Sequence, residues 1–273
     1  MEKIIFSAPA KLILTGEHAV VYGYPAIAMA INKRLKLEVV INENKLDWKI
    51  NSEIPVRCGL GSSAALSVTQ AALLLYLKTK KINKELINEI SFNLEKIHHG
   101  KPSGIDNTVA VYGGIILFKK FKLFKGLKVK KMPEFLLINS GKPSETTKEM
   151  VKNVESRIMN YETRKILKSI GKLSNRFVKA LNLEDLNSLG LLITENERLL
   201  EQLGVVGIKA QKLIQDIEKI GGSAKICGAG GLKTGSGIIL VYHKYLQDVK
   251  KYCQKNKLSF FMAKLEKQGV KYE

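Results

Sequence analysis

The chain has 273 residues, 45% of them hydrophobic, which is enough to form the core of one large domain or two small ones. Its formal net charge of +20 fits either a protein that binds nucleic acid or an anionic surface, or a protein whose solvated surface is rich in lysine. The lysines are spread over the whole chain and aromatic residues make up only 7%, which favours the solvated surface over a nucleic-acid partner.

The three cysteines, Cys58, Cys227 and Cys253, are too few and too scattered to indicate a disulfide framework or a metal cluster. No apolar run reaches the length of a membrane span, so no membrane partner is expected. Acidic Glu2 follows Met1 at once, which argues against a signal peptide. We therefore expect a globular cytoplasmic protein, either a monomer or a homodimer.

The first half of the chain mixes strand and helix patterns. Alternating or apolar runs predict strands at 3–8 and 11–14 with a kink at Pro9, and at 26–31, 35–42, 47–50 and 109–118. Apolar residues at helical spacing predict helices over 62–79 and 83–97.

A domain boundary is predicted near 130–145, after which helices dominate. Helices are expected at 145–159, 162–182, 184–203, 206–220 and 245–255, and strands at 135–139, 223–227, 236–242 and 258–263. One apolar stripe on the second of these helices is predicted to be core, and comprises Ile166, Ile170, Leu173, Phe177 and Leu181. The second half is therefore predicted to be helices packed on a small sheet, an α+β arrangement.

A glycine-rich turn precedes the first long helix, in the order Gly59-Leu60-Gly61-Ser62-Ser63. Glycine lets the backbone approach a ligand closely, and a helix start offers unpaired N–H groups, so this turn could bind phosphate. It could equally be an ordinary loop with a serine cap, and it lacks the lysine of the Walker pattern. A second glycine-rich stretch, Gly228–Gly231, could be a hairpin turn, but two such loops together favour one anionic ligand.

Residues 54–65 resemble the Pro-x3-Gly-Leu-Gly-Ser-Ser-Ala signature of the GHMP kinases, and residues 225–231 resemble their C-terminal Gly-Ala-Gly-Gly loop. Within that superfamily, residues 10–23 and 99–107 are most similar to the mevalonate kinase branch. The resemblance covers nearly the whole chain, with its motifs in the expected order.

The resemblance implies a two-lobed α+β fold, with an S5-like ATP-binding lobe at 1–135 and a ferredoxin-like lobe at 136–273 that completes the substrate cleft. The implied activity is ATP-dependent phosphorylation of mevalonate to 5-phosphomevalonate in isoprenoid synthesis, with Mg²⁺ as cofactor. A related kinase acting on phosphomevalonate or a sugar alcohol remains an alternative. A non-catalytic, basic RNA-binding protein is the other alternative, although such a protein would not need the catalytic set described next.

Asp106 is the expected general base, which would take the proton of the attacking hydroxyl. Lys11 is its expected partner, because a nearby ammonium keeps a carboxylate ionised. Ser63, with Ser62 as the alternative, and Glu95 match the Mg²⁺ ligands of the family.

The resemblance also implies two sets of binding residues. The expected substrate-binding residues are Glu17, His18, Ser103, Gly104 and, in a region carrying one extra residue, Thr147. The expected ATP-binding residues are Pro55, Gly59, Leu60, Gly61, Ser62, Ser63, Ala64, Gly228, Ala229 and Gly230.

Some parts of the chain depart from the family pattern. The stretch between His18 and Gly59 is short, so we expect a reduced base pocket around Trp48, which leaves the nucleotide preference open. The role of Lys233 is also open. His98, His243 and the cysteines are interpreted as structural, although Cys227 beside the second loop could be modifiable.

Overall fold

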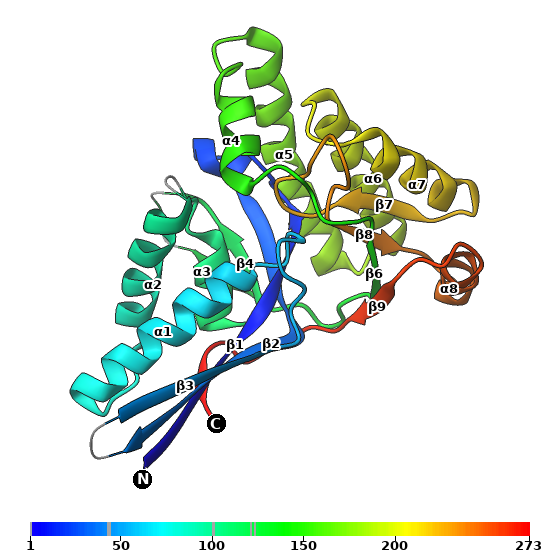
Figure 1. Cartoon of the computed structure of the whole chain (residues 1–273). Helices are drawn as coiled ribbons and strands as arrows, with labels where there is room; N and C mark the ends of the chain where they lie inside the picture. The colour runs from blue at the N-terminus through cyan, green and yellow to red at the C-terminus, as the bar shows by residue number, and fades with distance from the viewer. Residues whose placement is uncertain (1, 43–44, 100–101, 121, 123) are drawn as a thin grey trace.

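The structure is a computed structural model that describes residues 2–42, 45–99, 102–120, 122 and 124–273 (Figure 1). Two sheets organise the chain, one of six strands and one of four, and the pairings within them are antiparallel. Both termini lie at the same end of the molecule (Figure 1). Among the described residues, none of the helices combines the length and apolarity needed to cross a lipid bilayer.

The larger sheet has the strand order β10-β1-β2-β4-β5, and β3 pairs with the far part of β2. Its strands are β1 (Glu2–Thr15), β2 (Ala26–Asn42), β3 (Lys45–Ser52), β4 (Ile115–Phe118), β5 (Lys125–Leu127) and β10 (Lys271–Tyr272). The helices of this part are η1 (Ala19–Tyr22), α1 (Ser62–Thr79), α2 (Lys84–His99) and α3 (Ile105–Tyr112). α1 and α3 pack on β1 and β2, and α2 packs on these two helices.

The smaller sheet has the order β7-β8-β6-β9, so β6, the first of these strands in the chain, lies between β8 and β9. Its strands are β6 (Phe135–Asn139), β7 (Ser223–Ile226), β8 (Ile238–Tyr242) and β9 (Phe260–Ala263). The helices of this half are α4 (Thr147–Glu155), α5 (Tyr161–Leu183), α6 (Leu186–Gln202), α7 (Ile208–Lys219) and α8 (Leu246–Lys255). This antiparallel βαββαβ order is ferredoxin-like, as predicted.

One predicted strand is wrong. The β-branched run 109–118 was expected to form a strand, but its first part belongs to helix α3, and β4 begins only at Ile115. Gly113 and Gly114, at φ +74° and +68°, separate the two elements. A Cβ on Gly113 would lie 2.5 Å from the backbone nitrogen of Gly269, so a contact distant in sequence fixes this break. The predicted strands at 3–8 and 11–14 form one strand, β1, with a register shift between Pro9 and Ala10 in place of a break.

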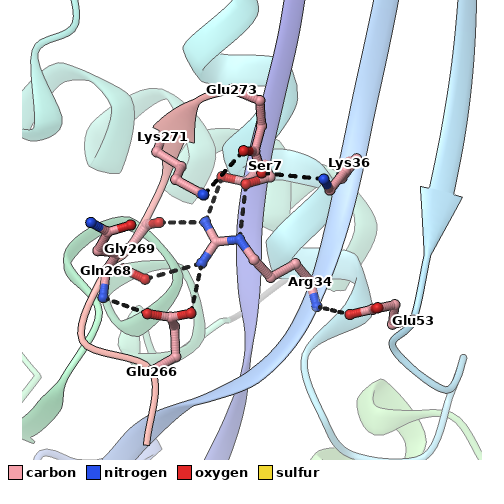
Figure 2. Close-up of polar contacts among 9 residues, drawn as sticks. All are labelled: Ser7, Arg34, Lys36, Glu53, Glu266, Gln268, Gly269, Lys271 and Glu273. Carbon is pink, nitrogen blue, oxygen red and sulfur yellow. Dashed lines mark hydrogen bonds and ion pairs between the residues drawn. The ribbon is translucent and has the colours of Figure 1, made fainter.

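The last residues of the chain return to the larger sheet, where the Arg34 side chain holds them (Figure 2). Its guanidinium donates to the carbonyls of Gly269 at 2.7 Å and Gln268 at 3.2 Å, and to the Ser7 hydroxyl at 2.9 Å. It also lies 3.5 Å from a carboxylate oxygen of Glu266. This anchor seats β10 against β1 and closes one edge of the sheet.

The main hydrophobic cluster continues from the larger sheet into the smaller one. It joins residues of β1 and α1 to Phe135 and Leu137 of β6 and to Leu173 and Phe177 of α5. The predicted stripe on α5 is therefore core, except that Ile166 is only partly buried. The smaller sheet begins at Phe135, close to the predicted boundary between the lobes. The C-terminal strand β10, however, pairs in the larger sheet, so the division into lobes at 135/136 stays a prediction.

Candidate active site

A cavity of about 560 Å³ lies where β1, α1 and α3 face α4 and the loop after β7. Its volume is in the range of small-molecule binding sites. Most of the predicted site residues line it, namely Lys11, Glu17, His18, Gly59, Gly61, Ser62, Ser63, Ala64, Glu95, Ser103, Gly104, Asp106, Thr147, Gly228, Ala229 and Gly230. The fold therefore brings together residues from both halves of the chain.

Lys11 and Asp106 form an ion pair in the cavity, with Lys11 Nζ 3.2 Å from Asp106 Oδ1. Lys11 lies on β1 and is 4% exposed, whereas the Asp106 side chain is 38% exposed and accessible from the cavity. Asp106 is in the first turn of α3, where the positive end of the helix dipole favours a carboxylate. The pair thus consists of a buried cation and an acid that a ligand can reach.

The two glycine loops meet backbone to backbone. A Cβ on Gly59 would lie 2.3 Å from the Cys227 carbonyl oxygen, and a Cβ on Gly228 would lie 3.1 Å from Gly59 Cα. Both glycines have positive φ, +89° and +88°, which a residue with a side chain rarely adopts. Only glycine fits this approach, and both loops thereby line the same cavity.

The start of α1 also lines the cavity. Its N-cap is Gly61 at φ +72°, rather than the serine that the sequence suggested, so no side chain caps the first N–H groups. A Cβ on Gly61 would lie 2.7 Å from Lys11 Cγ, which places the helix start against the Lys11 stem. A helix N-terminus of this kind is suited to bind a phosphate.

The two predicted metal ligands are neighbours. Ser63 Oγ donates to Glu95 Oε1 at 2.7 Å, and Ser67 Oγ donates to the same oxygen at 2.8 Å. Glu95 is 4% exposed, on α2. A hydroxyl and a carboxylate are hard oxygen donors of the kind that Mg²⁺ takes while keeping several waters. No cluster of three or more His, Cys, Asp or Glu side chains suited to a metal occurs within the part of the chain that the structure describes.

Glu17 lines the cavity, but its carboxylate is held from within the protein. It pairs with the ammonium of Lys225, and both side chains are 0% exposed. It also accepts from Asn196 Nδ2 at 3.2 Å. Lys225 donates to the Ile226 carbonyl at 2.8 Å as well. This buried pair ties the turn at 16–18 to strand β7.

His18 follows Glu17 and is fixed by the loop after β7. Its Nε2 lies 3.1 Å from the Ala229 carbonyl oxygen, which requires the tautomer with a proton on Nε2. Burial lowers the pKa of His18 to about 4, so the ring is neutral at physiological pH. Its backbone has φ 58°, an uncommon value for a non-glycine residue that is consistent with a functional site.

Glu197, on α6 behind the glycine loop, is a second buried acid near Lys225. Its Oε2 accepts from the Ile226 N–H at 2.9 Å, and its Oε1 has no hydrogen-bond partner among the described residues. Burial raises the pKa of Glu197 to about 8. Because Glu17 takes the ion pair with Lys225, the second carboxyl stays protonated at neutral pH.

Glu197→Gln is expected to flatten the dependence of stability on pH. The folded protein keeps the Glu197 proton up to a pKa of about 8, so between pH about 4.5 and 8 it binds more protons than the unfolded chain and loses stability as the pH rises. The loss is at most about 1.4 kcal/mol per pH unit, and the glutamine variant would lack it. Urea unfolding across this pH range measures the difference, with exposed Glu195→Gln as control. Parallel curves for Glu197→Gln and the unmodified protein would contradict the prediction.

Sequence reasoning missed several lining residues. Arg57 precedes the first glycine loop, and Lys148 and Lys152 lie on α4 beside Thr147. The i, i+4 spacing of these lysines places both on one face of the predicted helix, and this signal could have identified them. Lys225 is not part of the lining, but it had a signal as well, since it is a charged residue inside the predicted strand 223–227.

Other predicted residues lie elsewhere. Leu60 is fully buried in the core, and its carbonyl accepts the Lys11 N–H at 3.0 Å, while half-buried Pro55 is not part of the lining. Trp48 is 65% exposed on β3 and is also not part of the lining, contrary to the reduced base pocket expected there. Burial raises the pKa of Cys227 to about 11, which makes its thiol unreactive.

The segment before Pro102 is only partly described. Gly100 and Lys101 of the motif at 99–107 lie outside the described residues.

The predicted structural role of His243 is consistent with its bond to the Ile220 carbonyl at 2.9 Å. Lys233 donates its backbone N–H to Glu145 at 3.3 Å and is not part of the cavity lining.

Comparisons with known proteins extend over nearly the whole chain. Residues 21–114 match the family model described as GHMP kinases N terminal domain. The chain is 34% identical to the mevalonate kinase of Archaeoglobus fulgidus, over 84% of this chain and 89% of the relative. It is 29% identical to that of Methanocaldococcus jannaschii, over 96% and 99%. It also matches the crystal structure of the Methanococcus jannaschii mevalonate kinase with a TM-score of 0.82 and 27% identity, covering 97% of this chain and 99% of that one. These findings confirm the resemblance that the motifs indicated.

Proposed function

This chain belongs to the mevalonate kinases of the GHMP kinase superfamily, and we propose that it transfers the γ-phosphoryl group of ATP to the primary hydroxyl of mevalonate, which forms 5-phosphomevalonate. The observation that carries the proposal is the Lys11–Asp106 pair, at 3.2 Å, in the same cavity as the two glycine loops. A base, its charged partner and a phosphate cradle are what phosphoryl transfer requires of a protein.

In this proposal Asp106 accepts the proton of the mevalonate hydroxyl as its oxygen attacks the γ-phosphorus. Lys11 holds the Asp106 carboxylate in position through the ion pair at 3.2 Å, and its charge also favours the developing alkoxide. A positioned base of this kind contributes a factor of about 10²–10⁴ to the rate.

The backbone N–H groups at the start of α1 would hold the phosphates of ATP, between the loops at Gly59 and Gly228. The contact between these two loops supports this role, because it fixes the spacing of the cradle before the nucleotide binds. The first turn of α1 has no acidic side chain, so the positive end of the helix dipole favours binding of the negatively charged triphosphate.

Mg²⁺ would be held by Ser63 and Glu95, whose oxygens are adjacent and of the type that this ion prefers. When bound, the ion would neutralise charge on the transferring phosphate. Ser67, which also donates to Glu95, would keep that carboxylate oriented.

Mevalonate would lie on the side of Asp106 that faces α4. Ser103, Gly104, His18 and Thr147 are the proposed contacts, and Lys148 and Lys152 supply positive charge for the carboxylate of the substrate. Glu17 would act through its bonds to Lys225 and Asn196, which fix the turn carrying His18.

The test is an assay of ADP release with ATP, Mg²⁺ and one acceptor at a time, namely mevalonate, phosphomevalonate, galactose or homoserine. We expect turnover with mevalonate and background rates with the other three. Preferred turnover of another acceptor would assign the chain to a sister kinase. Turnover with none of them would contradict the proposal, while binding of ATP would still report on the phosphate cradle.

A further inference from the structure

Glu197 holds the chain at the entrance to the second glycine loop, and no step of the proposed reaction uses it. It lies on α6, 0% exposed, and its Oε2 accepts the N–H of Ile226 at 2.9 Å. Ile226 is the last residue of β7, shortly before Gly228–Gly230. The next residue, Cys227, donates its N–H to Ile238 beyond β7, so the N–H of Ile226 points away from β8. This N–H therefore depends on the Glu197 side chain for its hydrogen bond.

The carbonyl of Ile226 is held by a second buried side chain. The ammonium of Lys225 donates to it at 2.8 Å, donates to the Ile13 carbonyl at 3.3 Å and pairs with Glu17. An ammonium has three donors, and these three contacts use all of them. Lys225 therefore has no donor left for Glu197, although the two side chains are close enough to interact electrostatically.

The position of Ile226 sets the position of the glycine loop. Directly after it, the Cys227 carbonyl lies so close to Gly59 that a Cβ there would be 2.3 Å away. The Ala229 carbonyl then lies 3.1 Å from His18 Nε2. Contacts this close leave little freedom, so a shift of Ile226 would displace the loop from both the first glycine loop and the turn that carries His18.

The surroundings of Glu197 suit a neutral carboxyl group. Its Oε1 has no hydrogen-bond partner among the described residues, and burial raises the pKa of Glu197 to about 8. Lys225 on β7 and Arg198 on α6 favour the ionised form, whereas Glu201 on α6 opposes it. β1 and α5 also pack on α6, but none of the main charge effects on Glu197 comes from their described residues.

We propose that Glu197 is a positioning residue for the phosphate cradle, and that it holds the loop after β7 in place only while it keeps its proton. When the proton leaves, the new carboxylate competes with Glu17 for the donors of Lys225. Lys225 then gives up a contact to Glu17 or to the Ile226 carbonyl, and the glycine loop loses its fixed position. The inference rests on the proposed role of Gly228–Gly230 in binding the phosphates of ATP, and it concerns a residue that does not touch the nucleotide.

Calorimetric titration of the full chain with ATP and Mg²⁺, without an acceptor, tests this role as a function of pH. Above pH about 8 we expect the Kd for ATP to rise by up to about tenfold per pH unit, because one proton is lost from the folded protein. In Glu197→Gln the Kd should stay constant over the same range. Its amide oxygen can still accept the Ile226 N–H, but it cannot ionise.

Two further variants separate the proton from the hydrogen bond. Glu201→Gln removes the acid one turn further along α6, keeps Glu197, and should show the same alkaline rise in Kd as the unmodified protein. Glu197→Leu keeps the bulk of the side chain but leaves the Ile226 N–H unpaired. It should raise the Kd for ATP about 10- to 100-fold at every pH, with kcat at saturating ATP nearly unchanged.

The pH dependence of the Kd distinguishes positioning from a general effect on stability. A role in stability alone would change the urea midpoint of Glu197→Gln but leave its Kd as dependent on pH as that of the unmodified protein. An alkaline rise that persists in Glu197→Gln, or a Kd of the unmodified protein that stays constant above pH about 8, would overturn the proposal.

The titration contains no acceptor, so its result is independent of the substrate. An alkaline rise that Glu197→Gln abolishes, in a protein that phosphorylates an acceptor other than mevalonate, would contradict the proposed reaction and support the role of Glu197. Turnover of mevalonate together with a constant Kd would contradict only the role of Glu197.

Discussion

Asp106→Asn is expected to lower kcat about 10²–10⁴-fold, equivalent to about 3–5 kcal/mol of transition-state stabilisation, while ATP binding stays nearly unchanged. Asparagine keeps the size of the side chain and an oxygen for Lys11 Nζ, which lies 3.2 Å from Asp106 Oδ1, but it cannot take the hydroxyl proton. The loss should therefore appear in the chemical step and not in binding. Asp106→Ala should abolish turnover, because it removes the base and also the contact to Lys11.

Steady-state kinetics with mevalonate and a separate measurement of ATP affinity distinguish the two effects. Asp248→Asn is a suitable control, because Asp248 also lies in the first turn of a helix but is exposed on α8 and is not part of the cavity lining. Its kinetics should match those of the unmodified enzyme. If Asp106→Asn kept full turnover, Asp106 could not be the general base.

Lys225→Met is expected to destabilise the protein by about 3–5 kcal/mol, because it leaves the carboxylate of Glu17 buried without its cation. Both side chains of this pair are 0% exposed, so water cannot replace the lost partner. The stability of a domain is about 5–15 kcal/mol in total, which makes this a large fraction. The ammonium also donates to the Ile226 carbonyl, and that bond is lost too.

Denaturant unfolding measures this effect, and the double variant Lys225→Met/Glu17→Gln shows its cause. Removing both charges should recover at least half of the lost stability, since replacing a whole buried pair costs far less than breaking it. Lys219→Met is the control, because its exposed ion pair with Asp216 is expected to contribute less than about 1 kcal/mol. Equal losses in the single and double variants would show that the unpaired charge is not the cause.

The local patterns of the chain were sufficient for most of the fold. Helical spacing predicted α1, α2 and the helices of the second half, because an amphipathic helix must bury one stripe. The error at 109–118 has a tertiary cause. Valine and isoleucine favour strands, but Val109 and Val111 are buried in α3, which packs against α1 and α2. Packing at that position outweighed a propensity difference of at most about 1 kcal/mol.

The candidate site, too, has residues that the motifs predicted and features that only the tertiary structure shows. The motifs predicted residues that line one cavity, among them Lys11, Asp106 and the two glycine loops. They gave no indication of the Glu17–Lys225 pair, because an ion pair between residues this far apart in sequence exists only after the sheets have packed. They also suggested a base pocket at Trp48, which the structure instead exposes on an edge strand.

By itself, the sequence determined the positions of the glycine turns, the start of α1 and the family of the protein. These depend on short-range chemistry, since glycine permits positive φ and a helix start offers N–H groups whatever surrounds them. Only the tertiary structure decided which of these groups meet. It set Gly59 against Cys227, brought Lys11 to Asp106, gave Glu17 an internal cation and left β3 without cover. Burial and pairing between distant residues follow from how the two sheets pack, and no local pattern encodes that.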